Sequence, residues 1–181
     1  TNFTLQTPNG NAEVSFPLNG KHNILNALAA SAVGFSFGMT ANEIAESLKT
    51  VAPPPQRGEV LHFAEGFTVV NDTYNSNPDA LLSMVQTIVD GGNSAKRKIV
   101  IAGEMRELGE NAAQIHFETG RKIAELKVDK LFGVEGFAHD LLQGANLSGD
   151  FYENSATAAE KFIGEVQAGD LILVKGSRGV R

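Results

Sequence analysis

The chain has 181 residues, of which 42% are hydrophobic and 20% charged, a composition typical of a globular protein with a sizeable core. Its net charge of −6 and its scattered basic residues argue against a nucleic-acid partner. The absence of cysteine excludes disulfides and thiolate metal sites, and no apolar run is long enough to span a bilayer.

The first part of the chain predicts a β-hairpin followed by two helices. The hairpin covers residues 2–16, with its turn at 8–11. Apolar residues at helical spacing predict a helix over 23–37, ended by Gly38, and Thr40 is expected to cap a second helix over 41–48. The expected apolar face of the first helix consists of Ile24, Leu25, Leu28, Ala29, Ala32 and Val33. Three consecutive prolines at 53–55 predict a domain boundary near 52–56.

Strands and helices alternate after this boundary. The predicted strands cover residues 60–63, 67–70, 98–102, 130–134, 151–152 and 171–174. The predicted helices cover residues 79–89, 111–126, 138–142 and 157–166. This alternation indicates an α/β fold with a doubly wound, mostly parallel sheet covered by helices on both faces. No covering helix follows the last strand, so we expect the chain to be a fragment.

Polar clusters follow several of the predicted strands, at 72–77, 103–109, 135–136 and 175–178. Because the carboxyl ends of parallel strands meet at one edge of a sheet, and ligands of open α/β sheets bind there, we expect these clusters to lie together. Glycine-rich turns are common, so each cluster alone is generic. Glu104 and Arg106 in the second cluster also fit a solvent-facing pair.

The segment 72–77 is the most informative cluster, because Asp72, Tyr74, Asn75 and Asn77 supply many hydrogen-bonding groups. Its alternative interpretation is a strand-to-helix turn in which Asn and Asp cap backbone groups. On local chemistry alone the two interpretations are equally good.

Two other clusters favour structural interpretations when taken alone. His22, Asn23 and Asn26 gather at the start of a predicted helix, where Asn23 could be the cap and His22 a surface residue. Unsatisfied N–H groups at that helix start also favour acceptors or anions. Arg57 stands beside Glu59 after the prolines, and such pairs are usually solvated, although an arginine there could also bind phosphate.

In chain order, these motifs resemble the Mur ligase family. The matching patterns are Gly-x-His-Asn-x-x-Asn-x-x-Ala-Ala at 20–30, Arg-Gly at 57–58, Asp-x-Tyr-Asn-x-Asn-Pro at 72–78, Gly-x-Met-x-Glu-Leu-Gly at 103–109 with His116 and Gly120, and Lys-Gly-Ser-Arg at 175–178. Within the family, the third pattern resembles the member that adds D-alanyl-D-alanine.

The resemblance implies a cytoplasmic, monomeric enzyme of cell-wall (peptidoglycan) synthesis, needed for cell shape and division. It would use ATP and Mg²⁺ to join UDP-N-acetylmuramoyl-tripeptide to D-alanyl-D-alanine through an acyl phosphate. It implies that residues 1–55 are the end of a central ATP-binding domain. Residues 56–181 would be a Rossmann-like C-terminal domain that lacks its last helix.

The resemblance also implies roles for individual residues. The residues implied for ATP are His22, Asn23, Asn26, Arg57 and Asp72. The residues implied for the two other substrates are Tyr74, Asn75, Asn77, His116, Lys175, Ser177 and Arg178. For His116, inside a predicted helix, a core or surface role is an equal alternative.

The chain also departs from the family pattern. The phosphate-binding loop Gly-Thr-x-Gly-Lys-Thr/Ser is missing from the sequence, as are the modified lysine and magnesium-binding carboxylates of the central domain and the N-terminal UDP-binding domain. We therefore expect no catalytic residue and no metal ligand in this chain, and no ligase activity from it alone. The alternatives are a non-catalytic nucleotide-binding module and another amide ligase of the same family.

Overall fold

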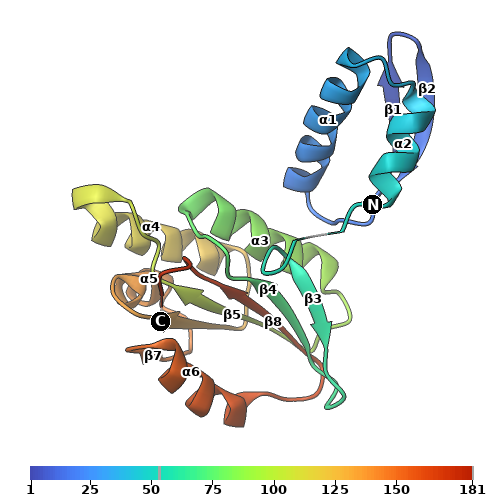
Figure 1. Cartoon of the computed structure of the whole chain (residues 1–181). Helices are drawn as coiled ribbons and strands as arrows, with labels where there is room; N and C mark the ends of the chain where they lie inside the picture. The colour runs from blue at the N-terminus through green and yellow to red at the C-terminus, as the bar shows by residue number, and fades with distance from the viewer. Residues whose placement is uncertain (53, 181) are drawn as a thin grey trace. The chain divides into compact units, whose positions relative to one another are not determined.

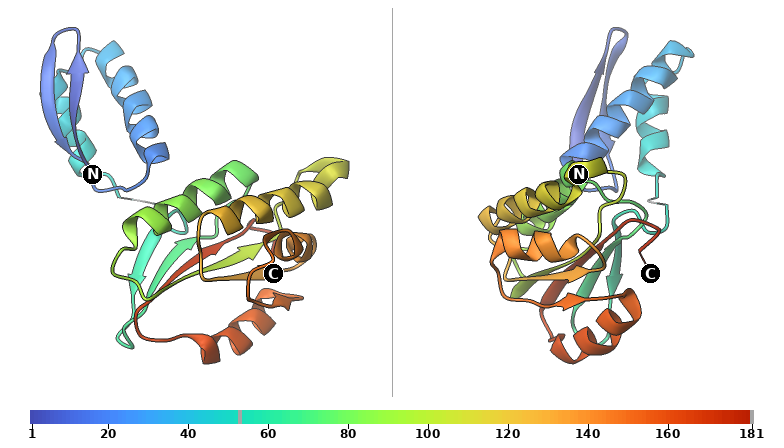
Figure 2. Two further views of the ribbon diagram at one scale, coloured as in Figure 1. Left: turned by 180° about the vertical axis from the view of Figure 1, so that it is seen from behind. Right: turned by 90° about the vertical axis from the view of Figure 1, so that its left-hand side faces the viewer.

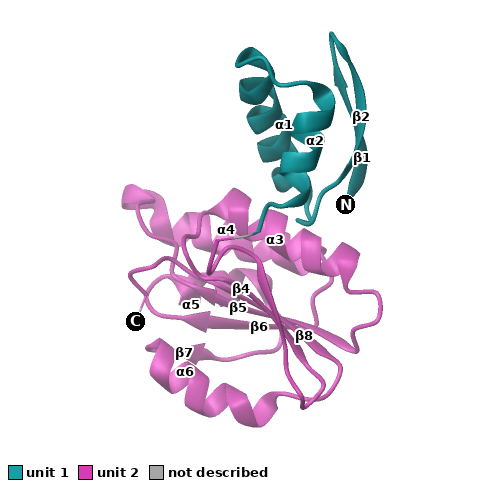
Figure 3. Cartoon of the chain, turned by 45° about the vertical axis from the view of Figure 1, so that its right-hand side comes forward, with its two compact units in different colours: residues 1–53 teal, residues 54–181 magenta. Residues whose placement is uncertain are grey.

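The computed structural model describes residues 1–52 and 54–180, so Pro53 of the predicted linker and the final Arg181 lie outside the described residues. The chain divides into two compact units, Thr1–Pro53 and Pro54–Arg181, coloured teal and magenta in Figure 3. Each unit is described by itself.

Unit 1 is a β-hairpin with two helices (Figure 1). Strands β1 (Asn2–Thr7) and β2 (Gly10–Ser15) pair antiparallel, and helices α1 (Lys21–Ser36) and α2 (Ala41–Lys49) follow. As predicted, Thr40 caps α2, and Glu43 completes a capping box by accepting the Thr40 N–H at 2.8 Å. The core of unit 1 packs the hairpin against α2, through residues such as Val14 and Ile44.

The apolar face predicted for α1 is largely exposed. The buried residues of α1 are Ala27 and Ser31, whereas Leu25, Leu28 and Val33 are each 57% exposed. Helical spacing showed that one face of α1 is apolar, but it could not show whether that face is covered.

Unit 2 contains a mixed sheet in the order β3-β4-β8-β5-β6-β7. Its strands are β3 (Glu59–His62), β4 (Thr68–Asp72), β5 (Arg97–Gly103), β6 (Lys130–Val134), β7 (Phe151–Tyr152) and β8 (Asp170–Lys175). β3 is antiparallel to β4, and every other neighbouring pair is parallel. The predicted α/β fold with a mostly parallel sheet is therefore confirmed.

Helices lie on both faces of this sheet (Figure 2). One face carries α3 (Pro78–Gly91), α4 (Ala112–Glu125) and α5 (Ala138–Ala145), and the other carries α6 (Ser155–Phe162). Short 3-10 turns, Gly109–Asn111 and Ile163–Glu165, precede α4 and follow α6.

The alternation of side chains along each strand divides the core between the two faces. Val100 and Leu173 belong to the cluster that includes α3, α4 and α5, whereas Ile99 and Ile172 belong to the cluster that includes α6. All four residues are at most 2% exposed. Strands buried on both faces read as continuous apolar runs, and this is why the sequence located them well.

Helices α4 and α5 meet through glycines. A Cβ atom at Gly120 would collide with the carbonyl oxygen of Leu141, and one at Gly144 would collide with that of Phe117. Such close backbone contact is possible only without a side chain at these positions. Among the described helices, none is both long enough and apolar enough to cross a membrane.

Candidate functional site

The loops that follow β4, β5, β6 and β8 gather at one edge of the sheet, as the sequence predicted, because these strands are parallel neighbours. We call these loops, at 72–77, 103–109, 135–137 and 175–180, the carboxyl rim. Backbone hydrogen bonds place Gln56 and Arg57 beside it, since the Tyr74 N–H donates to the Gln56 carbonyl at 3.2 Å.

A buried ion pair joins the ends of β4 and β8. Lys175 Nζ lies 2.5 Å from Asp72 Oδ2 and donates to the carbonyl oxygen of Asn75 at 2.8 Å. The Lys175 side chain is only 3% exposed and that of Asp72 15%. Asp72 and Lys175 are register partners in the sheet, so this lysine holds the β4–α3 loop against β8.

The ring of Tyr74, in the loop 72–77, contacts two arginines. The Arg57 guanidinium carbon is 3.9 Å from the centre of the Tyr74 ring, and that of Arg178 is 5.7 Å from the same centre. Both distances are typical of cation–π contacts. Within residues 1–52 and 54–180, neither guanidinium forms an ion pair.

The other half of the carboxyl rim is linked by charges. Arg106 Nη2 contacts Glu135 Oε1 at 3.0 Å, and Arg106 Nε lies 3.8 Å from Glu104 Oε2. Glu104 also accepts the N–H of Phe137 at 3.2 Å, and Ser177 Oγ accepts the N–H of Arg106 at 3.4 Å. Arg106 is thus neutralised by neighbouring carboxylates, in contrast to Arg57 and Arg178.

Left-handed backbone conformations mark the same loops. Of the described residues, those other than glycine with positive φ are Gln56, Glu107, Lys127, Glu135 and Asn146. Lys127 and Asn146 stand at helix ends, where this conformation is common. The other residues, with φ of 62–67°, all lie on or beside the carboxyl rim, and strain of this kind is concentrated at functional sites.

The implied substrate role of His116 does not fit the geometry. Its ring is fully buried, Nε2 accepts the N–H of Met105 at 2.9 Å, and Nδ1 lies 2.7 Å from the carbonyl oxygen of Ala112. Both ring nitrogens are therefore used by the backbone, and the imidazole fixes the loop after β5 onto α4. The core alternative describes His116 better.

Of the two asparagines in the β4–α3 loop, Asn77 fits the interpretation as a capping residue, and Asn75 is exposed as a ligand-binding residue would be. Asn77 caps α3, because its Oδ1 accepts the N–H of Ala80 at 2.8 Å, with Pro78 at the first helical position. Asn75 Oδ1 accepts the N–H of Ser76 at 2.9 Å, and the Asn75 side chain is exposed. The hydroxyl of Ser76 is buried and has no hydrogen-bond partner among the described residues.

The unit 1 candidates share the first turns of α1. Asn23 does not cap this helix as the structural interpretation supposed, because the helix starts at Lys21 and Gly20, with φ 96°, is the cap residue. Asn23 Nδ2 donates to the carbonyl of Asn19 at 2.8 Å, and Asn26 is exposed. His22 is partly buried.

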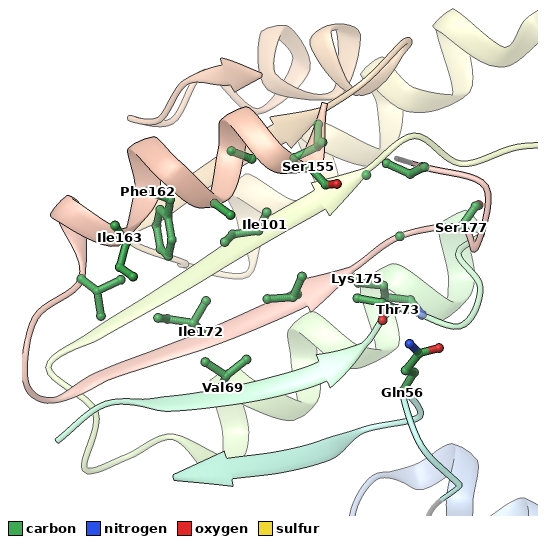
Figure 4. A pocket seen from close by; sticks show the side chains of 18 of the residues that line it. Gln56, Val69, Thr73, Ile101, Ser155, Phe162, Ile163, Ile172, Lys175 and Ser177 are labelled. Carbon is green, nitrogen blue, oxygen red and sulfur yellow. The ribbon is translucent and has the colours of Figure 1, made fainter. Parts of the chain in front are cut away.

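A cavity of about 580 Å³ opens on the α6 face of the sheet (Figure 4). Its floor is apolar and includes Val69, Ile101 and Ile172, and Phe162 of α6 forms a side of it. Its polar end includes Gln56, Thr73, Lys175 and Ser177, so the cavity extends to the carboxyl rim, and Arg178 also lines it. The sequence did not single out Gln56 or Thr73, because neither belongs to a charged motif.

The opposite edge of the sheet carries a different arrangement. Arg97 binds Asp170 with Nε–Oδ1 and Nη2–Oδ2 distances of 2.7 and 2.6 Å. Burial alone would raise the pKa of Asp170, but hydrogen bonds from Arg97 and the Gln167 N–H and the charge of Arg97 outweigh it and hold the pKa below its usual value. Among the described residues, no group of three or more His, Cys, Asp or Glu side chains could hold a metal ion.

This chain is similar in sequence to known proteins. A family model described as "Mur ligase, glutamate ligase domain" matches residues 56–178. The UDP-N-acetylmuramoyl-tripeptide–D-alanyl-D-alanine ligase of Escherichia coli (strain K12) is 33% identical over 180 residues, which cover 98% of this chain and 39% of that protein. The ligase of the same name from Bacillus subtilis (strain 168) is 29% identical over 91% of this chain and 37% of its own length.

Solved structures show the same similarity. A crystal structure of MurF from Acinetobacter baumannii matches with a TM-score of 0.85 and 31% identity, over 98% of this chain and 39% of that one. MurF ligase from Thermotoga maritima, solved in complex with ADP, matches with a TM-score of 0.77 over 94% of this chain and 38% of that one. Its identity is 24%, so this second likeness concerns the fold. The chain thus spans about two fifths of the length of the relatives it matches.

Proposed function

Because this chain belongs to the Mur ligase family, we propose that it forms part of an ATP-dependent ligase that joins D-alanyl-D-alanine to UDP-N-acetylmuramoyl-tripeptide. In this reaction the tripeptide carboxylate takes the terminal phosphoryl group of ATP, and the amine of the dipeptide then displaces phosphate to form the amide. Relatives of that printed name at 33% identity support the substrate assignment.

The observation that carries this proposal is the convergence of Arg57, Asp72, Tyr74 and Arg178 at the carboxyl rim. These residues come from three separate family motifs, at 57–58, 72–78 and 175–178, and the fold of unit 2 brings them together. The edge at the carboxyl ends of parallel strands is where ligands bind in open α/β sheets.

The geometry fits a nucleotide at this edge. Asp72 Oδ2 is held by Lys175, which fixes the carboxylate so that its other oxygen can accept from ribose hydroxyls. Arg57 is exposed and free of ion pairs with described residues, so it can bind phosphate. On the family motif at 20–30 alone, we propose that Asn23 and Asn26 bind adenine, with His22 shaping that region of unit 1.

For the remaining substrates we retain Asn75, which is exposed, and Ser177, which is buried but lines the cavity. His116, Asn77 and Lys175 are assigned supporting roles instead, because each is engaged by the protein itself. Mg²⁺ ligands are expected outside this chain, and the chain alone is expected to form no amide bond.

Calorimetry with the 181-residue chain tests the nucleotide assignment. We expect ADP to bind, and Asp72→Asn to weaken that binding about tenfold, as loss of a charged hydrogen-bond acceptor does. Asp79→Asn, which removes an exposed carboxylate from the first turn of α3, is the matched control and should bind ADP as the wild type does. Absence of ADP binding would contradict the assignment.

A chimera tests the reaction itself. This chain would replace the matching 39% of the Escherichia coli relative, and phosphate release that depends on D-alanyl-D-alanine would be measured. Activity in the chimera that is lost with Asp72→Asn supports the proposal. Amide formation by the 181-residue chain alone would overturn the expectation that it is inactive.

A further inference from the structure

The carboxyl rim carries cations in two different states. Lys175 is paired with Asp72, and Arg106 with Glu135 and Glu104. Arg57 and Arg178 have no carboxylate partner among the described residues. In a chain of net charge −6, two unneutralised guanidiniums on one ring form a local positive site.

We infer that Arg178 joins Arg57 in binding one polyphosphate group, and that Tyr74 is the positioning residue which holds both guanidiniums. The inference rests on the proposed function in taking this group to be the phosphate tail of the adenine nucleotide. Tyr74 and Arg178 thereby leave the group of residues that the family resemblance had assigned to the two other substrates.

The backbone around this ring is fixed on both sides. On one side, the Tyr74 N–H binds the carbonyl of Gln56, and the N–H of Arg57 binds that of Pro54 at 3.2 Å. On the other side, Lys175 binds the carbonyl oxygen of Asn75, the residue after Tyr74. The backbone on both sides of the ring is therefore held in place, and both guanidiniums lie against the ring.

Arg178 is fixed in a similar way. The preceding Ser177 is 7% exposed, and its carbonyl accepts the N–H of Val180 at 2.9 Å, which closes a turn around Arg178. Arg178 itself is exposed, so the guanidinium leaves this turn toward Tyr74 and solvent.

Phosphate is a better ligand for this pair than a carboxylate is. A polyphosphate offers several oxygens and more than one negative charge, so each guanidinium can form two parallel hydrogen bonds with it. One carboxylate carries a single negative charge on two oxygens, so it offers the two arginines less charge and fewer acceptor sites. The Tyr74 ring holds the guanidinium groups of both arginines in place before the anion binds. Less conformational entropy is therefore lost on binding.

Calorimetric titration of the 181-residue chain with inorganic pyrophosphate, at constant ionic strength, tests the inference. We expect Arg57→Gln and Arg178→Gln each to weaken binding about tenfold, because each removes a charge-assisted contact. Arg121→Gln removes an exposed arginine of α4 and should have no effect. Unchanged affinity in Arg178→Gln, or no binding of pyrophosphate by the wild type, would overturn the inference.

Variants of Tyr74 test its positioning role separately. Tyr74→Phe keeps the aromatic face and should bind pyrophosphate as the wild type does, whereas Tyr74→Leu should bind about threefold more weakly. Both variants should have the same urea unfolding midpoint as the wild type, since Tyr74 is 40% exposed. Equal affinity in Tyr74→Leu and wild type would remove the ring from this role.

Competing ligands identify the source of the anion. Pyrophosphate should be displaced by ADP more effectively than by UDP, and D-alanyl-D-alanine should not displace it. Displacement by the dipeptide would overturn the choice of phosphate, and a preference for UDP would overturn the choice of ATP. Failure of ADP to bind with pyrophosphate binding intact would count against the proposed function and not against the arginine pair.

Discussion

The two ends of the sheet in unit 2 differ in how their charged side chains are paired. At the amino ends, Arg97 and Asp170 saturate each other, and Lys130 lies 2.7 Å from Glu165. At the carboxyl ends, Arg57 and Arg178 are ordered on a ring without a carboxylate partner among the described residues. The same strands thus carry a mutually paired arginine and aspartate at one end and two arginines without a described carboxylate partner at the other.

Breaking the pair at the amino ends should have the largest effect. Asp170→Asn leaves Arg97 without its counter-ion at a site where the Asp170 side chain is 1% exposed and that of Arg97 22%. Removing one partner of a buried pair costs several kcal/mol, and the partial exposure of Arg97 reduces this to about 2–3 kcal/mol. Urea unfolding followed by tyrosine fluorescence measures it, since both tyrosines lie in unit 2. Pyrophosphate affinity should not change, and a loss of binding would break the separation of the two ends.

The same pair predicts a pH dependence. The pKa of Asp170 is lowered in the folded protein, so its stabilising contribution is present above the ordinary Asp pKa of about 4. The contribution is lost as the pH falls below that value and through the lowered pKa. The difference in unfolding free energy between wild type and Asp170→Asn should therefore be constant from pH 7 to 5 and shrink toward pH 3. A difference that does not shrink would show that the charge of Asp170 is not its source.

The Lys175–Asp72 pair sharpens the comparison, because it is an ion pair within the carboxyl rim. Lys175→Met should cost about 1–2 kcal/mol of unfolding free energy, less than Asp170→Asn, since Asp72 is 15% exposed and water can solvate it. Adding Asp72→Asn should recover part of this cost, which a double-mutant cycle measures as coupling energy. Strict additivity of the two substitutions would show that the two side chains do not stabilise each other.

The smallest effect is expected at the unpaired arginine. Arg178→Gln should change the unfolding free energy by less than about 0.5 kcal/mol, because the side chain is exposed and forms no ion pair with a described residue. Urea unfolding of this variant beside Arg121→Gln provides the comparison. A loss above 1 kcal/mol would mean that Arg178 supports the fold as well as a ligand.

The strands of unit 2 were predictable because burial on both faces produces continuous apolar runs. The run at 130–134 has the bounds of β6, and the run at 171–174 lies within β8. The apolar face of α1 shows the limit of the same reasoning. Leu25, Leu28 and Val33 have helical spacing, yet each is 57% exposed. Spacing reports which residues share a face and contains no information on what packs there.

The carboxyl rim was predictable as a place, because parallel strands bring their ends together. Its internal pairing was not, since Asp72 and Lys175 are 103 positions apart and meet only when β4 and β8 are neighbours in one register. His116 is a position where the sequence left a ligand role and a core role equally open. Its presence in a family motif indicated a ligand contact, whereas the structure shows a fully buried ring bonded to two backbone groups.

The glycine contact between α4 and α5 has a consequence for mutational data. A side chain at Gly120 or Gly144 would push the two helices apart and move the start of α5, where Phe137 donates its N–H to Glu104. The shape of the carboxyl rim thus depends on two residues outside the rim, Gly120 and Gly144, having no side chain. A saturation screen scored by ligand binding would rank these glycines with the arginines, and only a parallel screen scored by folding would separate the two kinds of sensitivity.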